Sequence, residues 1–320
     1  MPSRDDDTSE TDEFDDVTEA EIRAAFDEQS YVADDEIVTT VLLALRLGRP
    51  LLIEGEPGAG KTELAKVLAG GFDAELVRLQ CYEGLAAENA LYEWNYTKQL
   101  LAVQAGEGGV AEGATSDTDD ESVFSEPFLL ERPLLQALRG EGRRVLLVDE
   151  VDRADEAFEA LLLEVLSDFQ VSVPELGTIA ASTPPVVVVT SNRTRPLSDA
   201  LKRRCLYLHV TPPSFEKERE ILARKVPELH DAVAAELCGI VRRLREEPLR
   251  KPPGAAETID WARAVATLRE NGSEGTLSHA EVRRTLGAVL KEVEDVERVD
   301  DDLLDSLVEA ARAAREAAES

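Results

Sequence analysis

Residues 51–70 read LLIEGEPGAGKTELAKVLAG, and this stretch decides the fold. Its apolar start predicts a buried strand, and its end, ELAKVLAG, favours a helix. Between them, GEPGAGKT satisfies the pattern G-x-x-x-x-G-K-[ST], which is typical of loops that bind nucleotide phosphates. The alternative is a glycine-rich turn without a ligand, but the bare pattern arises by chance in only roughly 1% of chains of this length.

The chemistry of phosphate binding explains the spacing within this loop. Glycines let backbone N–H groups curl around phosphate oxygens, and the following helix presents its positive end to them. We expect Lys61 to reach the β- and γ-phosphates of ATP and Thr62 to bind Mg²⁺. The residues expected to contact the nucleotide are Gly55, Glu56, Pro57, Gly58, Ala59, Gly60, Lys61, Thr62 and Glu63.

Four more apolar runs predict buried strands. They are LVRLQC (76–81), RVLLVD (144–149), PVVVVT (185–190) and CLYLHV (205–210), and helix-like stretches separate them. Such near-continuous apolar strands alternating with helices indicate a parallel sheet covered on both faces. After Pro213 only helical patterns follow. The sequence therefore predicts an α/β nucleotide-binding domain over residues 31–212 and an all-helical lid domain over residues 213–320.

Polar residues directly follow two of these strands. Asp149 ends RVLLVD and Glu150 follows it, which suits a carboxylate that holds Mg²⁺ followed by one that polarises an attacking water. Asn192 follows PVVVVT, at the strand end where open α/β sheets bind ligands, and an amide there can hold water against the γ-phosphate. A solvated strand end and a turn-forming asparagine are the alternatives without function.

Two arginines end a predicted helix just before the last strand. In a ring of subunits, Arg203 or Arg204 could reach the γ-phosphate of a neighbour and stabilise charge that develops in the transition state. The alternative is that they only balance the negative end of the helix dipole.

Charge and composition exclude several classes of protein. The chain has 320 residues with 66 Asp and Glu against 35 Lys and Arg, a net charge of −31 that disfavours nucleic acid and anionic lipid as partners. No run approaches about 20 uncharged apolar residues, and the start lacks the pattern of a signal peptide. Three widely separated cysteines indicate a reducing compartment, so we expect a cytoplasmic protein.

The acidic excess is concentrated in a few segments. Residues 1–30 carry 12 acidic and 2 basic side chains and predict a disordered arm, and residues 104–126 carry seven acidic side chains and predict a flexible insertion. Only 8 of the 35 basic residues are lysine, which together with the acidic excess suggests the salt-rich cytoplasm of a halophile. A GC-rich genome also replaces lysine with arginine.

Together these motifs resemble the AAA+ ATPases, and within them the MoxR-type ATPases of the CoxD-like branch, which are encoded beside von Willebrand factor A domain proteins. The resemblance covers residues 31–270 and rests on GEPGAGKTELAKVLA, LQCYEGL, LYEWNYTKQLL, VDEVDRADEAFEALLLEVLSD, TSNRTRPLSDALKRRCLYL and ETIDWARAV. It implies an AAA+ P-loop base with a helical lid. It also implies a ring, usually a hexamer, that hydrolyses ATP to remodel or mature a client protein, often during insertion of a metal centre or cofactor.

The resemblance also implies individual roles. Residues 55–62 would be the Walker A motif, Asp149 and Glu150 the Walker B motif, and Asn192 sensor 1. Arg204 would be the arginine finger, with Arg203 as its rival. Residues 169–181, FQVSVPELGTIAA, would form the β-hairpin that precedes sensor 1 in this clade.

One departure from the family concerns the lid. AAA+ lids commonly offer a sensor 2 arginine, whereas residues 252–264 read PPGAAETIDWARA, without an arginine at the usual start of the helix. Lys251, Arg263 or a residue from another subunit could substitute.

The sequence thus predicts a Mg²⁺-dependent ATPase that works as a ring on a protein client, with a von Willebrand factor A domain partner. One alternative is a nucleotide-switched scaffold that recruits such a partner and uses slow hydrolysis only to reset. Another is a DNA-remodelling AAA+ enzyme, which the acidic balance disfavours.

Overall fold

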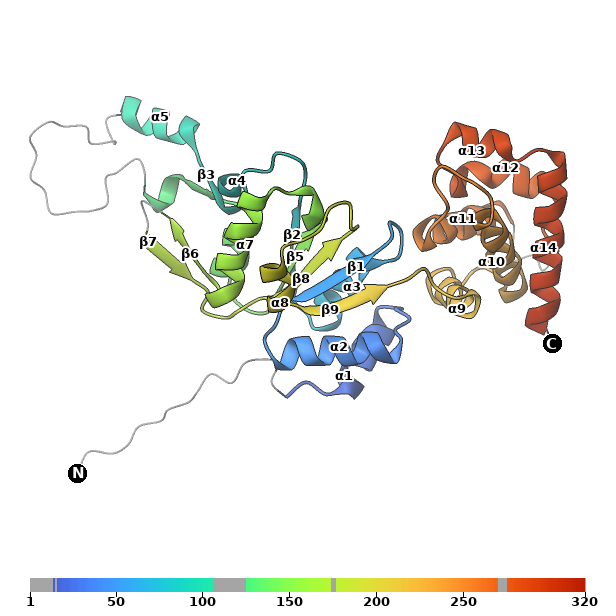
Figure 1. Cartoon of the computed structure of the whole chain (residues 1–320), viewed down its shortest axis with the longest axis horizontal. Helices are drawn as coiled ribbons and strands as arrows, with labels where there is room; N and C mark the ends of the chain where they lie inside the picture. Colours follow the sequence, from blue (N-terminus) through green and yellow to red (C-terminus); the bar gives the residue numbers. More distant parts are fainter. Residues whose placement is uncertain (1–13, 15, 106–124, 174–176, 270–274, 320) are drawn as a thin grey trace, which may run out of the picture. The chain divides into compact units, whose positions relative to one another are not determined.

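A sheet of five strands forms the centre of the α/β part of the chain. The structure is a computed structural model, and it describes residue 14 and residues 16–105, 125–173, 177–269 and 275–319. The strand order is β2-β5-β8-β1-β9, and the pairs β2–β5, β5–β8 and β8–β1 are parallel (Figure 1). The strands are β1 (Leu51–Gly55), β2 (Glu75–Gln80), β5 (Arg144–Asp149), β8 (Val186–Ser191) and β9 (Leu206–Val210).

These bounds agree with the apolar runs of the sequence to within one residue. Every residue of β5 is buried, as is every residue of β1. A strand without exposed positions must be covered on both faces, because successive side chains point to opposite sides. The predicted α/β class with a parallel sheet is confirmed.

Helices cover the sheet. They include α2 (Asp35–Arg46), α3 (Lys61–Gly71), α6 (Pro133–Arg139), α7 (Glu156–Asp168) and α8 (Asp199–Arg204). One core cluster joins Leu146 and Val148 of β5 to Leu134 of α6 and to Phe158 and Leu162 of α7. The sheet residues that point the other way, such as Leu147, are buried as well.

Two small antiparallel sheets lie outside the main one. One pairs β3 (Tyr92–Trp94) with β4 (Leu129–Glu131), and the other pairs β6 (Gln170–Val173) with β7 (Gly177–Ala180). The second is the hairpin expected at residues 169–181, with residues 174–176 outside the described ranges.

Short helical segments accompany these small sheets. They are α4 (Ala87–Leu91), α5 (Tyr96–Ala105) and the 3₁₀ turns η1 (Glu126–Phe128) and η2 (Val151–Arg153). Helix α5 extends two residues into the predicted insertion. Residues 106–124, which make up most of that insertion, lie outside the described residues.

From residue 215 onward every described element is a helix, as the sequence predicts. The helices are α9 (Phe215–Lys225), α10 (Asp231–Arg245), α11 (Ala255–Leu268), α12 (His279–Val289), α13 (Val293–Arg298) and α14 (Asp301–Glu319). They share their own core around the fully buried Trp261. Among the described residues, no helix combines the length and the apolar character that crossing a membrane requires.

The N-terminal segment differs from the prediction. Residues 1–13 and 15 lie outside the described ranges, but Glu19–Glu28 forms helix α1, so the expectation of an arm over residues 1–30 is wrong for this part. Ile22 and Phe26 are buried, 0% and 1% exposed. Two large apolar residues four positions apart lie on one helix face, and they anchor a segment whose average composition is that of a disordered chain.

Contacts divide the chain into two compact units. The first contains β2, β5, β8 and residues 51–54 of β1, together with α2, α6, α7 and α8. The second contains residues 23–34, the glycine-rich loop with the start of α3 (55–64) and the helical region from residue 209.

Candidate nucleotide-binding site

The glycine-rich loop, residues 55–62, connects β1 to α3. Gly58 and Gly60 have φ angles of +81° and +88°, which glycine adopts without steric cost. Loops of this kind turn their backbone N–H groups toward a common point and suit an anion. Glu56, Pro57, Gly58 and Gly60 are exposed, so the loop is open to solvent.

Lys61 is the first residue of α3, and its ammonium group lies over its own loop. Its Nζ donates hydrogen bonds to the carbonyl oxygens of Gly55 and Glu56, each at 2.8 Å. The side chain is buried, with 7% of the residue exposed. Thr62 and Glu63 follow in the first turn of α3, where Glu63 Oε1 lies 3.2 Å from Lys225 Nζ.

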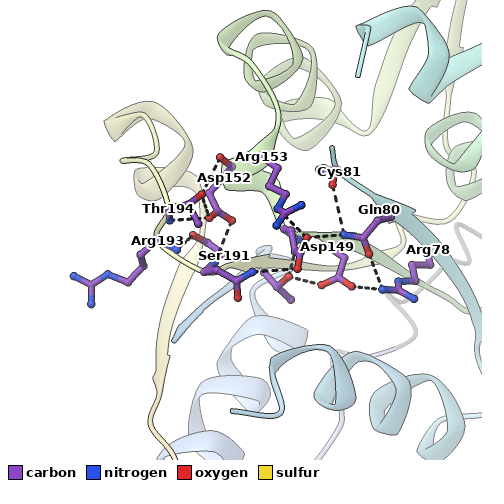
Figure 2. A network of polar contacts seen from close by, with 12 residues as sticks. Arg78, Gln80, Cys81, Asp149, Asp152, Arg153, Ser191, Arg193 and Thr194 are labelled. Carbon is purple, nitrogen blue, oxygen red and sulfur yellow. Dashed lines mark hydrogen bonds and ion pairs between the residues drawn. The ribbon is translucent and has the colours of Figure 1, made fainter. Parts of the chain in front are cut away.

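Asp149, the last residue of β5, is buried and holds two donors. Its Oδ1 accepts a hydrogen bond from Thr190 Oγ1 at 2.5 Å, and its Oδ2 pairs with Arg78 Nη2 at 2.6 Å (Figure 2). Arg78 reaches it because β2 pairs with β5 so that Gln80 lies opposite Asp149. Arg78 then lies two residues back, on the same side of the sheet.

Glu150 is held by amides from both neighbouring strands. Its Oε1 accepts a hydrogen bond from Asn192 Nδ2 at 3.1 Å, and its Oε2 accepts one from Gln80 Nε2 at 3.1 Å. The guanidinium of Arg153 lies 3.3 Å from the same Oε2. The backbone of Glu150 is left-handed, with φ +55° and ψ +49°, which strains a residue with a long side chain.

Asp152 ties the turn after β5 to the turn after β8. Its Oδ1 accepts the backbone N–H of Asn192 at 3.0 Å, and its Oδ2 accepts both the N–H and the hydroxyl of Thr194, at 2.8 and 2.6 Å (Figure 2). Burial raises the pKa of Asp152, but these hydrogen bonds outweigh burial and lower the pKa below its ordinary value. Asp152 therefore stays ionised and holds the backbone of Asn192 in position.

The structure thus brings Glu150 and Asn192 into contact beside Asp149. Sequence reasoning missed Arg78, Gln80, Thr190 and Asp152. A signal existed for the first two, because they are polar positions that alternate with buried apolar ones on β2.

Arg203 and Arg204 do not join this cluster. Both lie in the last turn of α8 with exposed side chains, and neither guanidinium has a partner among the described residues. Their backbone is fixed, however, because Arg49 donates to the carbonyl oxygens of Arg203 and Arg204, at 2.5 and 3.1 Å.

The candidates for sensor 2 are paired with acidic neighbours. Lys251 Nζ lies 3.3 Å from Glu257 Oε1, and Arg263 Nη1 lies 3.9 Å from Asp260 Oδ1. Both basic side chains are more than half exposed.

Most residues of this arrangement lie in a region that matches a known family. Residues 50–205 match the model of the AAA domain of the dynein-related subfamily. The matched region takes in the glycine-rich loop, Asp149, Glu150 and Asn192, and it ends just before β9. The chain accordingly has the AAA+ P-loop NTPase fold, followed by a helical region.

The individual relatives are distant in sequence. Uncharacterized protein SH1500 of Staphylococcus haemolyticus is 24% identical over 223 residues, which span 67% of this chain and 76% of that protein. Chaperone protein ClpB 2 of Parasynechococcus marenigrum is 32% identical over 176 residues, which span 51% of this chain but only 17% of the chaperone. A solved structure of the RuvB Holliday junction branch migration motor of Thermotoga maritima is 18% identical, with a TM-score of 0.46, and covers 87% of this chain and 72% of its own.

Proposed function

We propose that this chain is a Mg²⁺-dependent ATPase of the MoxR type, with an AAA+ base over residues 31–212 and a helical lid over residues 213–320. The observation that carries the proposal is the carboxylate of Glu150. It stands at the end of β5 between the amides of Gln80 and Asn192, next to the buried Asp149. A carboxylate positioned in this way suits a base that takes a proton from an attacking water.

The strand order supports ligand binding at one edge of the sheet. Strands β1, β8 and β5 are adjacent and parallel, so their carboxyl ends lie at the same edge of the sheet. Open α/β sheets bind ligands at that edge. The glycine-rich loop continues from β1, while Asp149, Glu150 and Asn192 follow β5 and β8.

The residues present fit ATP and Mg²⁺. The positive φ angles of Gly58 and Gly60 suit a phosphate cradle, and Lys61 would add a positive charge to it. Within the described ranges, the protein alone offers no group of three or more His, Cys, Asp or Glu side chains that could hold a metal ion. Mg²⁺ commonly combines one or two protein oxygens with substrate phosphates, and here Thr62 and Asp149 would supply them. The ion would neutralise charge on the phosphates.

In this mechanism Glu150 accepts the proton of the attacking water and Asn192 orients that water. Arg204, with Arg203 as its rival, acts on the site of a neighbouring chain, because neither side chain reaches the carboxylates of its own chain. This role requires a homo-oligomeric ring, which we propose to be a hexamer.

The client and the partner follow from the resemblance to MoxR-type ATPases. We propose that the ring remodels or matures a client protein together with a von Willebrand factor A domain protein, in the cytoplasm. The acidic excess supports a salt-rich cytoplasm as its setting and disfavours nucleic acid as a client.

Replacing Glu150 with Gln tests the proposed base. We expect hydrolysis of ATP to fall by about 100-fold or more, because the amide cannot accept a proton, while the Kd for ATP stays within about twofold. Steady-state phosphate release and calorimetric titration measure the two quantities. The control is Glu164→Gln, which changes an exposed carboxylate on α7. Turnover that Glu150→Gln leaves unchanged would refute the assignment.

The same variant tests the partner. Held in its ATP-bound form, Glu150→Gln should co-purify with a von Willebrand factor A domain protein only when ATP is present. If the variant also retains full partner function, a nucleotide-switched scaffold is favoured over a motor.

A further inference from the structure

The start of α11 makes a direct backbone contact with the glycine-rich loop. The N–H of Ala255 donates a hydrogen bond to the carbonyl oxygen of Gly58 at 3.3 Å. A Cβ atom at Gly254 would lie only 2.9 Å from Gly58 Cα and 3.1 Å from Gly58 O. The two segments therefore pack without a side chain between them.

The contact satisfies a donor that the helix itself leaves open. Ala255 is the first residue of α11, and the first N–H groups of a helix have no partner within it. Here a loop carbonyl provides that partner, so the end of the helix and the loop stabilise each other. A change in the orientation of the Gly58 carbonyl would deprive the N–H of Ala255 of this acceptor.

Gly254 is glycine because of this contact and not because of its backbone. Its φ of −90° is open to any residue. Gly58 differs, since its φ of +81° already favours glycine. Gly254 is thus the position where an added methyl group acts on this contact without backbone strain, although it also meets the neighbouring Glu257 carboxylate.

One further interaction steadies the start of α11, and another joins the helical region to the helix after the loop. Glu257 Oε2 accepts the N–H of Gly254 at 3.1 Å and so fixes the first turn of α11. Lys225, the last residue of α9, donates to Glu63 Oε1 at 3.2 Å, next to Thr62. The helical region therefore contacts both the middle of the loop and the helix that follows it.

We propose that the start of α11 senses the nucleotide through this backbone contact, in place of a sensor 2 arginine. The proposal rests on nucleotide binding by the loop. Ala255 and Ala256 carry no charge that could reach a phosphate. The conformation of the loop is therefore passed to α11 through the backbone contact. Because coupling between two sites is reciprocal, the contact that reports the loop also supports its phosphate-cradling form. Breaking the contact weakens nucleotide binding.

Hydrogen exchange on the full chain, with and without ADP and Mg²⁺, tests the coupling. In the unaltered protein, ADP should slow exchange both in the loop (55–63) and at the start of α11 (253–262). In Gly254→Ala the loop should still respond, whereas the response of α11 falls about fivefold or more and the Kd for ADP rises by a similar factor. The matched control is Gly287→Ala, at a helical glycine of the same region where a methyl group meets nothing within 4 Å.

A second variant loosens the start of α11 without adding a clash, and a matched variant at α12 serves as its control. Glu257→Ala and Glu281→Ala each delete the carboxylate that accepts the N–H of the residue before the helix, Gly254 for α11 and Ser278 for α12. Only Glu257→Ala should uncouple α11 from the loop. Full coupling in both Gly254→Ala and Glu257→Ala overturns the proposal while nucleotide binding stands. If ADP does not slow hydrogen exchange in the loop of the unaltered protein, nucleotide binding by the loop is refuted, and the proposal with it.

Discussion

At the scale of single residues, the pairing of Arg78 with Asp149 has a consequence for the metal. The Arg78 side chain is 49% exposed and that of Asp149 only 4%, so the guanidinium covers a buried carboxylate from the solvent side. Mg²⁺ would bind the same carboxylate. Arg78 and the metal therefore compete for one negative charge.

Arg78→Gln should bind Mg²⁺ more tightly in the presence of ADP, by about fivefold, the effect of removing an ion pair of about 1 kcal/mol. The same variant should melt at a lower temperature without metal, since the buried Asp149 loses the guanidinium that pairs with its Oδ2. Thermal unfolding followed during a Mg²⁺ titration measures both effects. Arg132→Gln is the control, because Arg132 is equally exposed but pairs with the exposed Glu93. Equal Mg²⁺ affinity in both variants would contradict the competition.

The sequence could predict the residues at strand ends but not their hydrogen-bond partners. Asp149, Glu150 and Asn192 are conspicuous because each interrupts an apolar run. Gln80 and Thr190 reach Glu150 and Asp149 only through the register of β2, β5 and β8, and register is a property of strand pairing that local patterns do not encode. The role of Asp152 was hidden for the same reason.

At the scale of elements, periodicity predicted the sheet and the helical region because each strand and helix buries a continuous face. Helix α1 was missed because only Ile22 and Phe26 anchor it within an acidic stretch. How closely two helices approach is likewise invisible in one sequence. At Gly239 of α10, a Cβ atom would lie 2.6 Å from Ala314 Cβ and 2.8 Å from Ala310 O of α14.

Gly239→Ala should therefore destabilise the helical region by about 1–2 kcal/mol, because overpacking outweighs the better helix propensity of alanine. Urea unfolding followed by the fluorescence of the buried Trp261, in a Trp94→Phe background, measures this change. The exposed Gly287→Ala should instead gain up to about 1 kcal/mol. Equal stability of the two variants would show that α10 and α14 tolerate a wider spacing.

At the scale of the whole molecule, the proposed ring places the function of α8 on a neighbouring chain. Arg204→Ala should lower the kcat for ATP by about 1,000-fold, since a finger arginine stabilises transition-state charge, and leave ADP binding intact. Arg203→Ala should act far less. Mixing Arg204→Ala with Glu150→Gln should recover part of the turnover, because some interfaces then combine an intact Glu150 with an intact Arg204. Phosphate release by the mixture measures this recovery, and its absence would contradict action between chains.

Arg49 links the end of α8 to the start of β1 within one chain. It lies two residues before β1 and donates to the carbonyl oxygens of Arg203, Arg204 and Cys205, so the end of α8 is fastened to the strand that leads into the glycine-rich loop. In a ring, the arginines offered to one neighbour would then be displaced together with the start of the chain's own β1. Arg49 would thus be the residue that joins a chain's own β1 to the arginines it offers to its neighbour.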